Sequence, residues 1–559
     1  MTSPAPGGGS SALGPSAVMA AGTVVSRLTG FIRTSMLVAA LGVGLSGDVF
    51  NIANTVPNML YILLAGGVFN AVLVPQLVRA IRTDPDGGDA YTNRVITLAG
   101  LFLAGASVLL VIAAPWLMRI FLSPAYFSAE CASPRDAVFA FARYCLPQVF
   151  FYGMFVLVGQ ILNSRRRFGP MMWAPIANNV IAIAVLGIYL ATYGKIAGDF
   201  TGGEEALLGL GSTLGIAVQL VVLVPFLRRS GFRFRPRFDF RHTGLGHTLK
   251  LGTWTVLFVV ANQIAYTVVV RIASGGTAHA IGHCGAGGAG TGYTVYANAF
   301  LLVMVPHSVI TVSLATAVLP RLSAAAAAGD LTAVARQVSA TLRTTYAAVL
   351  PLMALLPVIA TDAASLAFGW GRAKATFTYF VPTLSLFCLG LVFFTLHYLM
   401  LRGFYALEQT RRVFHIQCVV AAVNIVAAIV LTHGAPESQI APRLVIAYTI
   451  SYAVGAAISV SQLGGQLNGF DAAPVVRFTV RMTITVAIAT AVAWLVLHGM
   501  EHVLGGGNKI EVLIRLIVVG AADIGVVLVL ARTMRIREID DLTRQVALRL
   551  GKVGARGGL

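Results

Sequence analysis

Long apolar segments alternate with short polar connections along the whole chain. Each segment holds close to the ~20 residues that a helix needs to cross a hydrocarbon core of about 30 Å. Because lipid offers no hydrogen-bond partner to an exposed backbone, we expect these segments to be helices packed in a bundle. Fourteen spans are predicted, at residues 16–41, 48–77, 95–121, 137–163, 169–194, 206–227, 247–273, 294–320, 345–368, 377–401, 413–433, 441–463, 478–499 and 511–531. The predicted fold class is an all-α polytopic membrane protein.

Composition supports this prediction and excludes a soluble globular protein. Hydrophobic residues make up 57% of the 559 residues and charged residues only 11%, whereas a soluble domain has about 25% charged residues. The longest connections run to roughly 20 residues, too few to fold as separate domains. The chemistry of the chain is therefore expected inside the membrane.

The formal charge of +19 raises the question of a nucleic-acid partner. Most of the 40 Lys and Arg residues fall in alternate connections and in the C-terminal tail, which follows the positive-inside rule and predicts both termini in the cytoplasm. The densest basic stretches are Arg228–Lys250 and Arg532–Arg556. Their expected partners are anionic lipid headgroups, and no nucleic-acid partner is predicted.

An internal repeat suggests two lobes followed by a final pair of spans, with convergent composition of apolar segments as the alternative. Pro57-Asn58 in the second span and Pro306-His307 in the eighth each precede a Pro-x-Leu ending, and repeated halves with interrupted helices are typical of transporters. The predicted parts are a disordered leader at 1–15, a first lobe at 16–228, a basic linker at 229–246, a second lobe at 247–466, a C-terminal helix pair at 474–532 and a basic tail at 533–559.

Two arginines, Arg27 and Arg33, lie within the first predicted span, which contains no acidic residue. An arginine near a bilayer centre costs at least about 2.5 kcal/mol, so it is a functional candidate by default. Six residues apart on a helix, the two are about 120° apart around the axis and about 9 Å apart along it. A guanidinium fork suits phosphate oxygens. The alternative is that both side chains reach the cytoplasmic headgroups.

Asp48 and Asn58 are the polar candidates of the second span. Asp48 follows a short loop and is predicted either to pair with an arginine or, as the favoured alternative, to cap the helix N-terminus. Asn58 follows Pro57, where a freed carbonyl and an amide are suited either to a polar ligand or to a bond with a neighbouring helix.

Arg271 lies late in the seventh span, after the polar pair Asn262-Gln263. It is predicted either to add positive charge to a cavity or to mark the helix end, because a Gly-rich loop is expected from residue 274. His279 and His283 in that loop, beside Cys284, are weak evidence for a metal site.

The five cysteines lack metal-ligand or C-x-x-C spacing. Cys131 and Cys284 fall on the predicted outer side, where a disulfide could form, but two free thiols are the favoured interpretation. In the later spans, Asp362 is expected to be solvated near a helix end. Asp523 is expected to touch a ligand or a neighbouring helix.

Four stretches together resemble the MurJ (MviN) family of lipid II flippases, within a superfamily that includes MATE exporters. They are SRLTGFIR at 26–33, GDVFNIANTVPNMLYILLAGGVFNAVLVP at 47–75, NSRRRFGPMMWAPIANNVIAI at 163–183 and RGFYALEQTRRVFHI at 402–416. The resemblance implies two six-helix lobes plus a final pair, with Arg27 and Arg33 holding the diphosphate of the lipid and with Asp48 and Asn58 on the family pattern.

The chain departs from that family pattern at several positions. Tyr61 and Ile62 stand where many members have arginines, Gly66 stands where they have an acid, and Phe300-Leu301 replaces another cavity arginine. Arg271 is a candidate to compensate for these losses.

The resemblance also implies partners and a driving force. Lipid II is the implied partner, with its polyprenyl tail on the final helix pair, in the bacterial cytoplasmic membrane. No cofactor is implied. The implied driving force is either the membrane potential or Na⁺, for which the seventh span offers only Asn262 and Gln263 and the eleventh span offers Asn424; Asn262 and Asn424 are the candidate ligands.

The function predicted from the sequence is a lipid II flippase that works by alternating access, and not an enzyme. The alternatives are a related exporter of a drug or of another polyprenyl-linked glycan, and a non-transporting scaffold for cell-wall synthesis proteins. A membrane glycosyltransferase is disfavoured because it needs acidic residues in a sizeable outer loop.

Overall fold

The structure is a computed structural model that describes residues 13–63, 77, 80, 84–86, 88–165, 167–194, 199–239, 245–280, 291–467, 469, 472–504 and 508–544. All regular structure in these residues is helical. Thirteen of the described helices are long and apolar enough to cross a membrane. They match the predicted spans except 48–77, whose second half, with Gly66 and Pro75, lies outside the described residues. The predicted all-α polytopic fold is confirmed.

The chain forms two compact units, Met1–Ala289 and Gly290–Leu559. The sequence predicts a second lobe from residue 247, whereas the seventh membrane helix, α11, clusters with the first unit because it packs on α2 and α5. The helices of the first unit are α1 (Leu13–Leu41), α2 (Leu45–Ile62), α4 (Asp89–Ile112), α5 (Ala114–Phe121), α6 (Ala132–Cys145), α7 (Gln148–Ser164), α8 (Gly169–Tyr193), α9 (Gly202–Val221), α10 (Leu223–Arg229) and α11 (Leu245–Ala280), with short 3₁₀ turns η2 (Pro124–Phe127) and η3 (Ala129–Cys131).

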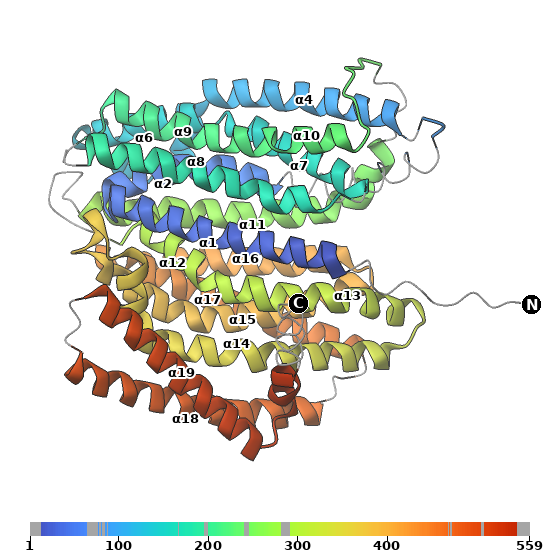
Figure 1. Ribbon diagram of the computed structural model, residues 1–559, viewed down its shortest axis with the longest axis vertical. Coiled ribbons are helices and arrows are strands. Elements are labelled where there is room, and N and C mark those ends of the chain that lie inside the picture. Colours follow the sequence, from blue (N-terminus) through green and yellow to red (C-terminus); the bar gives the residue numbers. More distant parts are fainter. Residues whose placement is uncertain are drawn as a thin grey trace, which may run out of the picture. The chain divides into compact units, whose positions relative to one another are not determined.

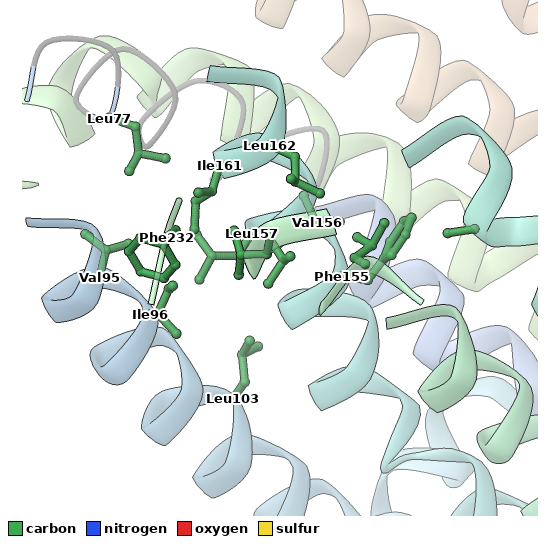
Figure 2. Packing of buried hydrophobic residues seen from close by; sticks show 14 residues of the cluster. Leu77, Val95, Ile96, Leu103, Phe155, Val156, Leu157, Ile161, Leu162 and Phe232 are labelled. Atoms are coloured by element: carbon green, nitrogen blue, oxygen red, sulfur yellow. The ribbon is translucent and has the colours of Figure 1, made fainter. Parts of the chain in front are cut away.

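A packed apolar cluster joins α4, α7 and the segment that follows α10. Val95 and Leu103 of α4 and Ile161 of α7 are buried in it, and Phe232 enters it from outside the helices (Figure 2). Between helices in lipid the gain comes from van der Waals contact rather than from removal of apolar surface from water. The ring of Phe232 therefore fastens the chain after α10 to α4.

The structure describes the basic connection after α10 as far as residue 239. It runs extended along α4, where the backbone N–H of Arg235 donates to Asn93 Oδ1 (2.7 Å) and that of Arg237 to Thr97 Oγ1 (3.2 Å). The hydrogen bond and charge of Arg94 lower the pKa of the Asp239 carboxyl below its ordinary value. The first part of the predicted linker thus lies along α4, and we call it the strap after α10. Residues 240–244 lie outside the described residues.

The second unit contains the remaining described helices. They are α12 (Tyr293–Pro306), the π-helical turn η4 (His307–Thr311), α13 (Val312–Ala327), α14 (Leu331–Phe368), α15 (Phe380–Ala406), α16 (Thr410–Thr432), α17 (Ile440–Gln466), α18 (Ala472–Val503) and α19 (Lys509–Thr533), with 3₁₀ turns η5 (Gly371–Ala373), η6 (Phe377–Tyr379) and η7 (Glu437–Gln439). The predicted C-terminal pair, α18 and α19, packs together and against α14 (Figure 1).

Helix ends follow local chemistry. Thr201 and Glu204 form a reciprocal capping box at the start of α9, and Asp330 Oδ1 accepts from the Ala333 N–H (2.8 Å) at the start of α14. At Pro306 the missing N–H opens the helix, and η4 continues it with wider turns before α13 resumes.

The prediction that a Gly-rich loop begins at residue 274 was wrong. Helix α11 continues to Ala280 through Ser274 and Gly275. A Cβ added at Gly275 would lie 3.0 Å from Ser123 Oγ, and Ser274 Oγ accepts from the Ser123 N–H (2.8 Å). Close packing on the η2 turn therefore overrides the weak helix propensity of glycine.

Cys131 is buried and disulfide-bonded, so the expectation of a free thiol there was wrong. Cys284, the partner in the alternative that the sequence left open, lies outside the described residues, as do His283, the first twelve residues of the leader and the tail beyond residue 544.

Candidate functional site

The first unit places Arg33 near an aromatic side chain of α7. Tyr152 of α7 lies close enough to interact electrostatically with Arg33, and its ring contacts that of Tyr61 on α2 with centroids 4.7 Å apart. Arg33 is half-buried. The helix α1 is held against α8, where Asn179 Nδ2 donates to the Ser26 carbonyl (3.0 Å). The Arg33 guanidinium thus lies near Tyr152, whose ring in turn contacts Tyr61.

Arg27 lies on another side of α1 from Arg33, as the six-residue spacing predicts. Its side chain is exposed. Among the described residues, neither arginine has a carboxylate within ion-pair distance. Both positive charges are therefore available to an anionic ligand, and their role as substrate contacts stays a prediction.

Asp48 is fully buried in the first turn of α2, but it does not cap that helix. The N-cap is Gly44, and the Asp48 carboxylate accepts a hydrogen bond from Thr277 Oγ1 of α11 (2.7 Å). The favoured prediction of a cap was wrong because α2 begins at Leu45, so that Gly44 takes the N-cap position and Asp48 lies within the first turn. The carboxylate instead fastens α2 to α11, near the point where η2 packs on α11.

A second bond joins the same two helices at the interrupted part of α2. Gln263 Nε2 donates to the carbonyl oxygen of Met59 (2.8 Å), two residues after the buried Pro57. Asn58 is exposed. The interhelical bond expected at this proline is therefore made by Gln263, and Asn58 stays a candidate for ligand contact.

The side chain of Arg271, a residue of α11, lies at the C-terminal end of α5. Its Nη1 donates to the carbonyl oxygens of Arg119 (2.8 Å) and Ile120 (3.2 Å), in the last turn of that helix. A cation at a helix C-terminus satisfies unpaired carbonyls and favours the helix dipole. Since α11 continues to Ala280, Arg271 does not mark the helix end; its predicted part in substrate binding stays a prediction.

The predicted ion ligands fall in different units. Asn262 is exposed on α11 and has a polar contact of its own, while Asn424 is half-buried on α16. Asn424 Oδ1 is buried without a hydrogen-bond partner among the described residues. An ion site shared by the two asparagines stays a prediction. No group of three or more His, Cys, Asp or Glu side chains suited to a metal occurs in the described part of the chain.

The second unit contains a buried ion pair that sequence reasoning missed. Arg515 of α19 binds Asp362 of α14 through two parallel bonds, Nε to Oδ2 (3.0 Å) and Nη2 to Oδ1 (2.5 Å). Only 8% of the Arg515 side chain and 7% of the Asp362 side chain are exposed. The expectation that Asp362 is solvated was wrong.

One signal could have revealed the pair. Asp362 and Arg515 have opposite charges and lie at similar depths, near the outer ends of the ninth and fourteenth predicted spans.

Other buried polar groups lie in the same unit. Asp523 of α19 is 1% exposed, and neither carboxylate oxygen has a hydrogen-bond partner among the described residues. His307 of η4 bonds Thr395 (3.0 Å), and His397 bonds Ser459 (2.9 Å). These histidine hydrogen bonds join different helices, and their partners lie too far away in the chain for sequence spacing to reveal them.

The chain matches the family model described as "Lipid II flippase MurJ" over residues 37–513. The matched range includes Asp48, Asn58, Asn262, Arg271 and Asn424, whereas Arg27 and Arg33 precede it. A relative from Rhizobium meliloti (strain 1021), "Probable lipid II flippase MurJ", is 26% identical over 440 residues, covering 77% of each chain. The "Lipid II flippase MurJ" of Burkholderia cenocepacia is 25% identical over 396 residues, covering 70% of this chain and 72% of the relative.

Solved structures agree on the fold. "Lipid II flippase MurJ, inward closed conformation" superposes with a TM-score of 0.70 at 18% identity, covering 94% of this chain and all of that chain. An inward-facing MATE family transporter of the MOP superfamily has a TM-score of 0.62 at 16% identity, covering 81% of this chain and 98% of the other. With the family match over most of its length, the chain belongs to the MurJ family of lipid II flippases.

Proposed function

We propose that this chain moves lipid II from the inner to the outer leaflet of the bacterial cytoplasmic membrane by alternating access. The observation that carries the proposal is the location of Arg27 and Arg33 and their lack of a counter-charge among the described residues. Both belong to a membrane-spanning helix of a MurJ family member, and neither has an ion-pair partner among the described residues. The family consists of transporters rather than of catalytic proteins.

The chemistry of the two arginines fits a diphosphate linked to a lipid. Each guanidinium stays charged at any working pH and donates parallel hydrogen bonds to phosphate oxygens. Near Arg33, the hydroxyl of Tyr152 offers a further donor. Because the two arginines are about 9 Å apart along α1, they suit one extended headgroup rather than a single phosphate.

Transport requires that the headgroup binds the two end states of the protein unequally. A ligand shifts a conformational equilibrium only by its differential affinity for the states. In our proposal the arginines hold the diphosphate more tightly in the inward-open state, and release follows when the units change their relative arrangement. The polyprenyl tail stays in lipid against α18 and α19.

Topology and energetics complete the proposal. Both termini lie in the cytoplasm, and the basic segments contact anionic headgroups there. The driving force is either the membrane potential or Na⁺ held by Asn262 and Asn424. Binding of cell-wall synthesis proteins belongs to the scaffold alternative.

The test uses full-length protein reconstituted in vesicles that contain lipid II. The measured quantity is the fraction of lipid II that a membrane-impermeant probe reaches at the opposite leaflet. Arg27→Gln and Arg33→Gln are each expected to abolish the increase caused by the protein. The matched control Arg321→Gln removes the same charge from an exposed position near the end of α13 and is expected to leave transport unchanged.

Two results would count against the proposal. Full transport by the double variant Arg27→Gln/Arg33→Gln would exclude the arginines as the diphosphate site. Transport of a cationic drug or of another polyprenyl-linked glycan, with none of lipid II, would instead favour the related-exporter alternative.

A further inference from the structure

A surface groove lies between α16 and α17 of the second unit, with a volume of about 570 Å³. We call it the α16–α17 groove. It is lined by Arg412, His415, Ile416, Val419, Ile458 and Gln462. The two helices pack along each other and are joined by the short turn η7, so they run antiparallel. Arg412 near the start of α16 and Gln462 near the end of α17 therefore lie at the same end of the pair.

The lining changes from polar to apolar along the helices. Val419 is seven residues further along α16 than Arg412, which places it about 10 Å deeper. On α17, Ile458 lies one turn deeper than Gln462. The polar side chains thus lie at the end that the sequence predicts to face the cytoplasm. The apolar side chains lie deeper, toward the membrane interior. A molecule with a polar head and an apolar chain matches this order.

The polar end attracts anions. Arg412 and His415 are exposed, the adjacent Arg411 is also exposed, and none of the lining residues is acidic. The N-terminus of α16 adds a partial positive charge in the same place, since the helix dipole is positive there. Basic side chains next to the cytoplasmic leaflet favour anionic phospholipid headgroups.

We propose that the α16–α17 groove is a binding site for an anionic glycerophospholipid. Arg412 and His415 hold the phosphate, Gln462 bonds the glycerol or ester oxygens, and one acyl chain lies on Val419 and Ile458. The site involves none of the arginines of α1 and does not depend on lipid II transport.

The test measures lipid adducts on the delipidated full-length protein by native mass spectrometry, with phosphatidylglycerol and phosphatidylcholine as the probes. The structure predicts that phosphatidylglycerol binds more tightly than phosphatidylcholine. Arg412→Gln is expected to weaken phosphatidylglycerol binding about fivefold, since one basic residue near the surface contributes that much. Arg321→Gln, the control with the same loss of charge, is expected to leave it unchanged.

A second variant tests the apolar end. Val419→Asn is expected to weaken phosphatidylglycerol binding but not the binding of soluble glycerol 3-phosphate, which has no acyl chain.

Three outcomes would overturn the inference. Equal binding of the two phospholipids would remove the role of charge. Unchanged phosphatidylglycerol binding in Arg412→Gln would place the lipid elsewhere. If Arg412→Gln weakened lipid II binding but not phosphatidylglycerol binding, the groove would be a site for the transported lipid. Arg33→Gln, measured in parallel, separates this site from the proposed diphosphate site, because it should leave phosphatidylglycerol adducts intact.

Discussion

Arg33 in the first unit and Arg515 in the second are both arginines of membrane-spanning helices, but their surroundings differ. The Arg515 guanidinium is bound by both oxygens of Asp362 and is almost fully buried. Arg33 is half-buried and has Tyr152 near it, with no carboxylate within ion-pair distance among the described residues. A neutralised pair joins two helices, whereas an arginine without a counter-charge keeps its attraction for an anion. The partner, rather than the residue type, therefore separates a structural arginine from a candidate site.

The largest expected effect comes from breaking the pair in the second unit. Asp362→Asn leaves the Arg515 charge buried without a counter-charge, and removing one partner of a buried pair costs about 3–5 kcal/mol. Thermal unfolding of the purified protein in detergent is expected to show a much lower midpoint. The matched control is Asp523→Asn on α19, since neither oxygen of that buried carboxylate has a partner among the described residues.

A double variant separates charge from packing. Asp362→Leu with Arg515→Met removes both charges, and apolar replacement of a buried pair is often neutral or stabilising. Its unfolding midpoint should lie close to that of the unmodified protein. If Asp362→Asn and Asp523→Asn are equally destabilising, the contrast between paired and unpaired groups in this unit does not hold.

A smaller effect is expected where a carboxylate joins two helices of the first unit. Thr277→Val keeps the shape of the side chain but removes the hydroxyl that donates to the buried Asp48. A buried acceptor that loses its donor costs about 1–3 kcal/mol. Unfolding measurements should therefore place this variant between Asp362→Asn and the unmodified protein. Thr277→Ser, which keeps the hydroxyl, serves as the control, and equal losses in both variants would assign the effect to packing.

The sequence predicts the helices well because the length of an apolar run is a local property. The arginines of α1 were found for the same reason, since a charge inside such a run is visible without knowledge of its neighbours. The partners of charged groups were missed. The Asp362–Arg515 pair depends on the packing of α14 against α19, and the bond from Thr277 to Asp48 depends on the packing of α11 against α2.

The predicted boundaries of helices and loops were wrong where tertiary packing outweighs local helix propensity. Ser274 and Gly275 belong to α11, although glycine-rich sequence usually ends a helix, because the bare Gly275 backbone packs closely on Ser123. The strap after α10 is a similar case. Its backbone N–H groups donate to the side chains of Asn93 and Thr97, and no local pattern in the basic sequence predicts these hydrogen bonds.

The smallest effect on stability is expected at Arg33 itself. No described carboxylate loses a partner when Arg33 is replaced, so Arg33→Gln should change the free energy of unfolding by no more than about 0.5 kcal/mol. Its affinity for lipid II should nevertheless fall by one to two orders of magnitude, because hydrogen bonds to charged groups contribute about 1.5–3 kcal/mol. Unfolding and lipid II titration on the same preparation check both values. A large loss of stability with unchanged affinity would make Arg33 a structural arginine like Arg515, and the difference between the two units would then lie only in the identity of the partner.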